Sequence, residues 1–178
     1  MQGKVAYDGG RFTDAVAAWT EATRQSQAQG NSLAEALGLS YLSLAYQSLG
    51  QWDEAEGAIA QSMTLIDTQL NAQQRNPDPA TATDLQRLHA QSLNAQATLQ
   101  LAQGQPETAI NTWQQAARIY GQLGDDIGVL GSTINQVQVL QSMGLYHQAS
   151  RLLNSVIASV QAQPSSRLKA VDKVDSVG

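Results

Sequence analysis

The two histidines, His89 and His147, are the side chains best suited to acid–base catalysis or metal binding. A metal site needs three or four ligands together with residues that orient them, and the chain contains no Cys. The lack of Cys also excludes disulfide bonds and thiolate chemistry. We therefore expect both histidines to be ordinary surface or turn residues, and we expect no metal and no other cofactor.

Acidic residues gather at two places, residues 53–56 and residues 125–126. Paired carboxylates can act as general acid and base, but both clusters stand where helices are expected to begin, and negative charge there stabilises a helix through its dipole. The run 124–131 lacks the Gly-Lys-Ser/Thr of a phosphate-binding loop, so Gly128 and Gly131 are interpreted as sites of close helix packing. No convergent set of acids, bases and nucleophiles can be assembled. We predict that the chain is not an enzyme.

Composition narrows the classes of partner. The formal net charge is −5, the pI is about 4.8, and the ten Lys and Arg residues are scattered, which disfavours nucleic-acid binding. The apolar stretches are far too short for a membrane-spanning helix. The first ten residues do not form a signal peptide and read as a piece of a longer chain. We expect a soluble protein, cytoplasmic by default, with export left open if a signal peptide precedes this piece.

The sequence contains an internal repeat, and the structure of the repeated units determines where any functional side chains lie. A phrase of the form Gly-x-(aromatic)-x-x-Ala begins at Gly10, Gly50, Gly104 and Gly144, with Pro106 replacing the aromatic in the third copy. A shift of 94 positions places the sequence on itself without a gap over 46 residues, which indicates duplication of a two-unit block. The phrase recurs after 40 residues within each block. The insert 71–84 lengthens the interval between blocks to 54.

Each unit is interpreted as two antiparallel helices. In the second unit, apolar residues three and four positions apart mark one face of the first helix, namely Leu39, Leu42, Ala45, Tyr46 and Leu49. Gly50 ends that helix, because a left-handed conformation costs Gly little. The short turn forces the next helix to run back antiparallel. Asn31 and Asp125 are predicted N-caps, and Pro106 stands at a first helical turn, where Pro is tolerated.

Small and aromatic residues are predicted to set the packing. Alanines stand where two helices must approach closely, at Ala15, Ala55, Ala109 and Ala149. The aromatic of each phrase is expected to fill the wedge at the turn, and Trp19 and Trp113 are expected to be buried anchors. One helix pair cannot bury its apolar face alone, so stacked pairs are needed.

These positions resemble the tetratricopeptide repeat (TPR) family over residues 1–163. Unit two carries the pattern in Leu39, Leu42, Ser43, Tyr46, Gly50, Trp52, Ala55 and Ile59. The resemblance implies an all-α, right-handed α-solenoid of antiparallel helix pairs. Its four units would span 1–30, 31–75, 80–124 and 125–163, with the insert at 71–84 and a truncated further helix at 164–178. The period of 40 departs from the family's 34, so we expect longer second helices.

A narrower resemblance concerns the Gln-rich 40-residue units. Phrases such as LSLAYQSLGQWDEAE and WQQAARIYGQLGD look like the repeat region of large bacterial proteins whose TPRs precede a caspase-like CHAT protease domain. That catalytic domain uses a His–Cys pair. Because this chain has no Cys, the resemblance implies a sensing or docking arm without the enzyme.

The TPR resemblance places a binding groove on the concave face, which is lined by the first helices. Outward positions there, Ile134 among them, give the candidate groove residues Tyr7, Ser40, Gln47, Asn94, Thr98, Gln138 and Gln141. Their amide and hydroxyl groups suit hydrogen bonding to a peptide. The family's carboxylate clamp is absent, because Arg87 is the one basic residue on the complete first helices.

The predicted function is therefore a protein–protein interaction scaffold that docks a peptide or protein partner, with no nucleic acid and no membrane span. Two alternatives stay open: a regulatory arm for a missing catalytic domain, and self-association through exposed array ends. The insert 71–84 is either an inert linker or a loop that touches a partner.

Overall fold

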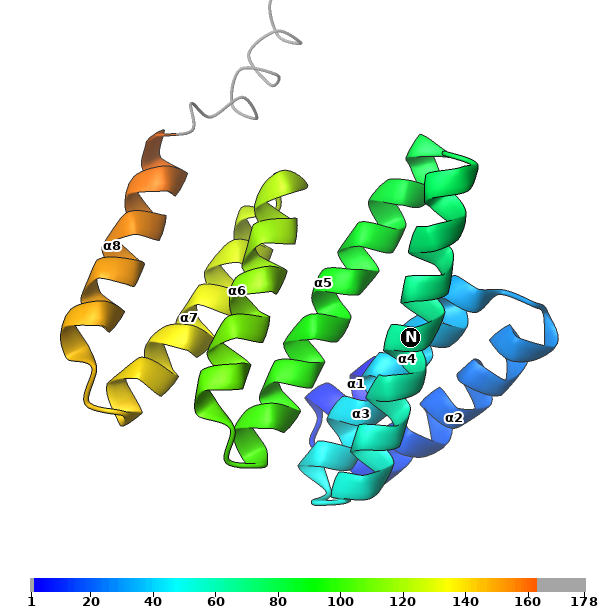
Figure 1. The fold of residues 1–178 in the computed structure, drawn as a ribbon. Helices are drawn as coiled ribbons and strands as arrows, with labels where there is room; N and C mark the ends of the chain where they lie inside the picture. Colours follow the sequence, from blue (N-terminus) through cyan, green and yellow to red (C-terminus); the bar gives the residue numbers. More distant parts are fainter. Residues whose placement is uncertain (1, 163–178) are drawn as a thin grey trace, which may run out of the picture.

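The computed structural model describes residues 2–162. All secondary structure in these residues is helical, and consecutive helices pack as antiparallel pairs (Figure 1). The predicted all-α solenoid of helix pairs is confirmed. The helices are α1 (Gln2–Asp8), α2 (Phe12–Ala28), α3 (Ser32–Ser48), α4 (Trp52–Arg75), α5 (Pro79–Ala102), α6 (Pro106–Gln122), α7 (Asp126–Ser142) and α8 (Tyr146–Ala162). The predicted partial helix at 164–178 lies outside the described residues.

Among α2 to α8, the helix length is constant with one exception. The helices α2, α3, α6, α7 and α8 each have 17 residues, and turns of three residues separate them. A new helix therefore begins every 20 residues within each block. First and second helices share the length of the 40-residue unit equally, so the extra length is not confined to second helices as predicted.

The exception is the pair α4 and α5, which have 24 residues each. The insert 71–84 was expected to be a linker or loop, but residues 71–75 continue α4 and residues 79–84 begin α5. Ala, Gln and Arg in the first part favour helix, and the residue before Pro77 leaves the helical region with φ −140°. Asp78 then caps α5, and Pro79 occupies its first position.

Six glycines end helices in the left-handed region, with φ between 66° and 77°: Gly10, Gly30, Gly50, Gly104, Gly124 and Gly144. At Gly50 the next amide, of Gln51, donates to the Tyr46 carbonyl at 2.9 Å. At Gly124 the Asp125 amide donates to the Tyr120 carbonyl, also at 2.9 Å. The same glycine turn therefore closes helices both within pairs and between pairs.

Side-chain caps occur at the turns between pairs. Asn31 accepts from the Ala34 amide at 3.1 Å, and Asp125 accepts from the Gly128 amide at 2.9 Å, so both predicted N-caps are confirmed. The N-cap residues of α2, α4 and α6, which follow turns within pairs, form no side-chain cap. The two edges of the array therefore differ in chemistry.

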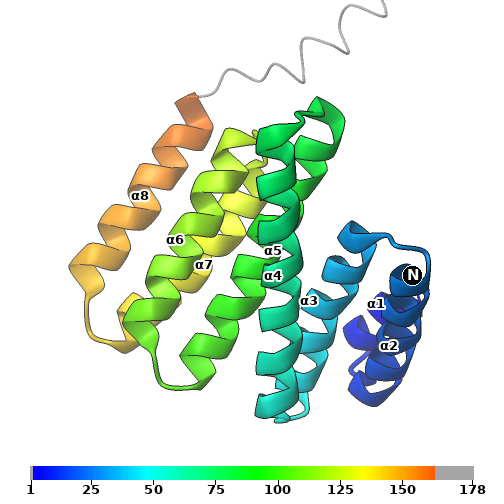
Figure 2. The same cartoon turned by 45° about the vertical axis from the view of Figure 1, so that its right-hand side comes forward.

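The helices form two layers. The first helices α3, α5 and α7 lie in one layer, and the second helices α4, α6 and α8 lie in the other (Figure 2). α3 packs directly against α5, whereas α4 makes no comparable contact with α2 or α6. At the α3–α5 junction the first helices approach each other more closely than the second helices do, and we call the layer of first helices the inner layer.

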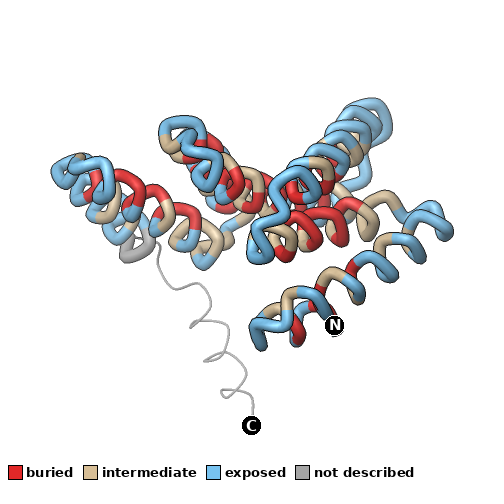
Figure 3. The backbone as a smooth tube through the Cα atoms, turned by 90° about the horizontal axis from the view of Figure 1, so that it is seen from below, coloured by how far each residue is buried: buried red, intermediate tan, exposed pale blue. Residues whose placement is uncertain are grey.

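Buried residues follow the middle of the helices, and the helix ends are exposed (Figure 3). The repeated alanines Ala15, Ala55, Ala109 and Ala149 are all buried. A larger side chain at any of them would separate the helices, at a cost of roughly 1–3 kcal/mol.

Two of the three turn aromatics, Trp52 and Tyr146, do not fill the wedge as expected. Trp52 is 45% exposed and Tyr146 is 67% exposed, while Phe12 is partly buried against Tyr7. Each is the first residue of its helix. Because Cα–Cβ bonds tilt toward the helix N-terminus, these side chains point beyond the end of the helix.

The two glycines in α7 also differ from each other. A Cβ at Gly128 would overlap the ring of Tyr120, which confirms close packing there. A Cβ at Gly131 would meet nothing within 4 Å. The interpretation of Gly131 as a close-packing site is therefore wrong.

Candidate interaction surface

The inner layer carries the residues predicted to line a groove, and the structure divides them into three groups. Ser40 is buried; Tyr7, Gln47 and Asn94 are partly buried; and Thr98, Gln138 and Gln141 are exposed. The exposed three come from α5 and α7.

Ser40 must be corrected, because its hydroxyl cannot face a groove. It lies 2.8 Å from the Ser62 hydroxyl and 2.6 Å from the Ser92 hydroxyl, and Ser62 donates to the Ala36 carbonyl at 2.8 Å. All three serines are buried. A buried hydroxyl requires a hydrogen-bond partner, and here α3, α4 and α5 satisfy one another. This serine cluster (Ser40, Ser62 and Ser92) fixes the junction between the second and third pairs.

Gln47 links α3 to α5. Its Nε2 donates to the Ser43 hydroxyl at 3.1 Å and to the Ala95 carbonyl at 3.2 Å. The side chain is therefore engaged in packing neighbouring first helices and is not free to bind a ligand with its donor.

Asn94 links α5 to α7 in the same manner. Its Oδ1 accepts from the Ser132 hydroxyl at 3.0 Å. Tyr120 of α6 lies beside it, and burial raises the pKa of Tyr120 to about 12, with an opposing effect from the Asn94 hydrogen bond. Polar contacts thus join α3 to α5 and α5 to α7.

Tyr7 belongs to an aromatic cluster at the start of the array. Its ring centroid lies 5.3 Å from Phe12 and 5.6 Å from Trp19. The Ser48 hydroxyl donates to the Tyr7 hydroxyl at 3.3 Å. The phenol therefore joins α1 to α3 and offers only part of its surface to a partner.

What stays open on α7 is a mixed stripe of apolar and amide groups. Ile134 is 47% exposed and Ile127 is 83% exposed, and Gln138 and Gln141 continue the same helix face. Ile127 is not among the predicted groove residues. Its spacing of seven residues from Ile134, about two helical turns, is the signal that places the two on one face.

The arrangement offers hydrogen bonding and apolar contact. Among residues 2–162 no three His, Asp or Glu side chains come together as a metal site would require. His89 is partly buried, and this burial lowers its pKa while Asp67 opposes the shift. None of the described helices is long and apolar enough to cross a membrane.

Comparison with known proteins shows that the fold of this chain is similar to that of solved structures. No protein-family model and no curated protein matches the sequence. The crystal structure of BtubC (BKLC) from P. vanneervenii matches with a TM-score of 0.65 at 16% identity, covering 92% of this chain. The chain spans 63% of the length of that protein. A putative kinesin light chain with nearly identical TPR-like repeats from Podosopora anserina gives a TM-score of 0.38 at 19% identity, covering 92% of this chain and 94% of that one.

At this identity the likeness concerns the fold alone. It agrees with an all-α array whose eight described helices pack in sequential antiparallel pairs. It does not extend to a partner or to the CHAT-protease resemblance.

Proposed function

We propose that the chain is a non-enzymatic scaffold that docks a peptide or protein segment on its inner face. The observation that carries the proposal is the open stripe on α7, where Ile134, Gln138 and Gln141 are exposed. Each glutamine amide offers a donor and an acceptor to a peptide backbone, and the isoleucine offers an apolar contact.

Rigidity supports the same proposal. The serine cluster and the Gln47 and Asn94 contacts hold the first helices together with buried or partly buried hydrogen bonds. A preformed surface loses less conformational freedom on binding. The inner face is therefore suited to bind a segment without rearranging.

The test is affinity capture with three forms of the chain: the natural sequence, a Gln138→Ala/Gln141→Ala variant, and a matched outer-layer variant, Gln114→Ala/Gln115→Ala in α6. All four glutamines are exposed, so folding is preserved. We expect the inner-face variant to lose captured partners that the outer-face variant keeps. Equal capture by all three forms would remove the inner face from consideration.

No feature of the described residues favours a regulatory arm for a CHAT protease, so that role is not part of the proposal. Self-association is favoured by one observation. Exposed Val5 corresponds, after the shift of 94, to Leu99, which is buried in one apolar cluster with Ala55 and Ile59 of α4. The same shift of 94 relates Ala55 and Ile59, the α4 residues in contact with Leu99, to Ala149 and Leu153 of α8.

A second copy could therefore place Val5 against α8 as Leu99 lies against α4. Light scattering over a dilution series tests this candidate. Self-association predicts a mass that rises with concentration and a Val5→Glu variant that stays monomeric. A constant monomer mass for the natural chain would exclude it.

A further inference from the structure

The exposed apolar side chains are unevenly distributed. Five of the nine large ones in the described residues lie at turns within pairs: Leu49, Trp52, Leu101, Met143 and Tyr146. These turns follow one another along one edge of the array, the lower edge in Figure 1. We call residues 49–56, 101–107 and 143–147 the turn edge.

The turn itself does not require these rings. The turns at Gly30 and Gly124, at the opposite edge, have φ of 67° and 66°, against 71° and 77° at Gly50 and Gly144. The first helical residues after them are Ser32 and Asp126. The same backbone turn is therefore made without an aromatic, and Trp52 and Tyr146 leave 45% and 67% of their surface exposed.

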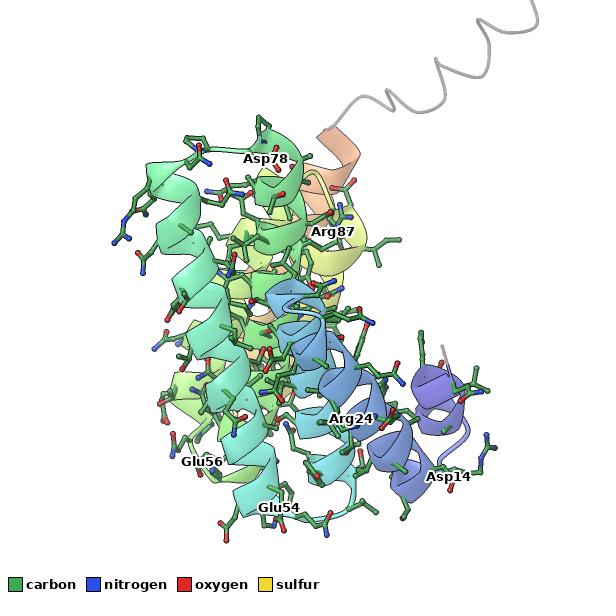
Figure 4. The ribbon with its side chains drawn as sticks, turned by 90° about the vertical axis from the view of Figure 1, so that its right-hand side faces the viewer. Asp14, Arg24, Glu54, Glu56, Asp78 and Arg87 are labelled. Atoms are coloured by element: carbon green, nitrogen blue, oxygen red, sulfur yellow. The ribbon has the colours of Figure 1, made fainter. Side chains whose placement is uncertain are left out.

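Charge at the turn edge has one sign. Its acidic residues are Asp53, Glu54, Glu56 and Glu107, and it contains no Lys or Arg; the basic residue of the first turn within a pair, Arg11, lies outside it and pairs with Asp14 at 3.3 Å. Glu56 accepts a hydrogen bond from Gln103 at 3.2 Å, but none of the four carboxylates forms an ion pair with a described residue. Figure 4 shows Glu54 and Glu56 at this edge, with Asp78 and Arg87 toward the other.

We propose that the turn edge is a second interaction surface, which binds a positively charged protein segment that also carries apolar side chains. A guanidinium or ammonium group is attracted to the face of an indole, and the neighbouring carboxylates strengthen that attraction. Apolar side chains of the partner cover Leu49, Met143 and Tyr146. Phosphate-rich partners are repelled by the same charge, which separates this surface from a nucleic-acid or anionic-membrane site.

Trp52 provides a built-in reporter of binding, because Trp19 and Trp113 are only 8% and 2% exposed. The probe is an amphipathic helical peptide of leucine and arginine, titrated into the full 178-residue chain and followed by tryptophan emission and calorimetry. A second peptide with glutamate in place of every arginine is the charge control. We expect saturable binding with a shift in Trp52 emission for the arginine peptide and no binding for the glutamate peptide.

Two variants test the two halves of the surface. Trp52→Ala removes the ring, and Asp53→Asn/Glu54→Gln removes charge with little change in shape. Each is expected to weaken binding of the arginine peptide by about fivefold or more, measured by calorimetry. Circular dichroism confirms that both variants remain folded, which their exposed positions lead us to expect.

Matched controls lie elsewhere on the molecule. Ile127→Ala removes an apolar residue that is more exposed than Trp52 but at the opposite edge, and Gln138→Ala alters the inner face. Both should bind the arginine peptide as the natural chain does. Unchanged affinity in the Trp52 and charge variants, or equal binding of the two peptides, would overturn the proposal without affecting the inner-face function.

Discussion

Trp19 of α2 and Trp113 of α6 occupy equivalent positions in the two duplicated blocks, which we call the two corners, yet the residues around them differ. Each stands one helical turn after a fully buried alanine, Ala15 for Trp19 and Ala109 for Trp113. Trp19 stacks on Tyr41, with centroids 5.0 Å apart and planes 15° from parallel, whereas Trp113 packs among Ala97, Ala109 and Val139. The residue equivalent to Tyr41 is Asn135. The duplication thus preserved the close approaches of the backbone while the side chains around each indole diverged.

A second difference concerns burial. Ala116 of α6 is buried in one cluster with Ala90 and Leu93 of α5, but its equivalent in α2, Ala22, is exposed. Equivalent alanines of the two blocks therefore belong to the core in one case and to the surface in the other.

The largest expected effect comes from truncating the two indoles. Trp19→Ala and Trp113→Ala should each destabilise the fold by about 3–5 kcal/mol, because a large buried side chain is replaced by a cavity. Urea unfolding followed by circular dichroism measures both. A cost below about 1 kcal/mol for one of them would break the equivalence of the two corners.

A smaller effect is expected from adding one methyl group. Gly128→Ala should cost roughly 1–3 kcal/mol, because the new Cβ would overlap the Tyr120 ring. The first block already has Ala34 at this position, opposite Ser26 in place of Tyr120. Gly131→Ala in the same helix is the control.

That control should raise stability by about 0.5–1 kcal/mol, because its Cβ would meet no atom within 4 Å. Thermal unfolding distinguishes the two variants. If both alanines shifted the melting temperature in the same direction, contact with Tyr120 could not be the cause.

Replacing each indole with phenylalanine sharpens the comparison further. The Nε1 of Trp113 is buried and has no hydrogen-bond partner among the described residues, which costs about 1–3 kcal/mol. Trp19 gains instead from stacking on Tyr41, worth about 0.5–1.5 kcal/mol. Trp113→Phe should therefore be the milder change, by about 1 kcal/mol, in the same urea experiment. A milder Trp19→Phe would contradict this view of the two corners.

The smallest effect concerns His89 in the long α5, which has no counterpart in the first block. Because burial lowers its pKa from 6.5, the folded chain binds the proton less readily than the unfolded chain. Its contribution to stability is complete above pH 6.5 and falls as the pH drops below that value. His89→Gln should remove this part of the pH dependence between pH 7 and pH 5. The matched His147→Gln variant, at an exposed turn, should keep it.

The architecture could be predicted from local signals. Gly50 and Gly124 mark turns by themselves, Asn31 and Asp125 mark caps, and the alanines mark close contacts, because each depends only on backbone geometry nearby. The insert was harder, since Pro77 and Pro79 suggested a loop although the residues before and after them favour helix.

The candidate surface was less accessible to prediction. Ser40 is polar and stands at an outward position of α3, but Ser62 and Ser92 from two other helices give it buried partners. No periodicity reveals such a meeting of three helices. Trp52 shows the reverse case, because an aromatic beside a glycine turn suggests burial and only the start of α4 at that residue explains its exposure.

The lengthened hairpin has a geometrical consequence. Seven residues turn an α-helix through almost two full revolutions, short by about 20°. Adding seven to both α4 and α5 therefore keeps the rotational phase of each helix, so that the same sides still meet above and below the added segment. A change of five residues, about 140° beyond one full turn, would have turned the apolar side of one helix away from the other. Lengthening both helices of a pair by seven residues therefore leaves the packing of the other pairs in the array unchanged.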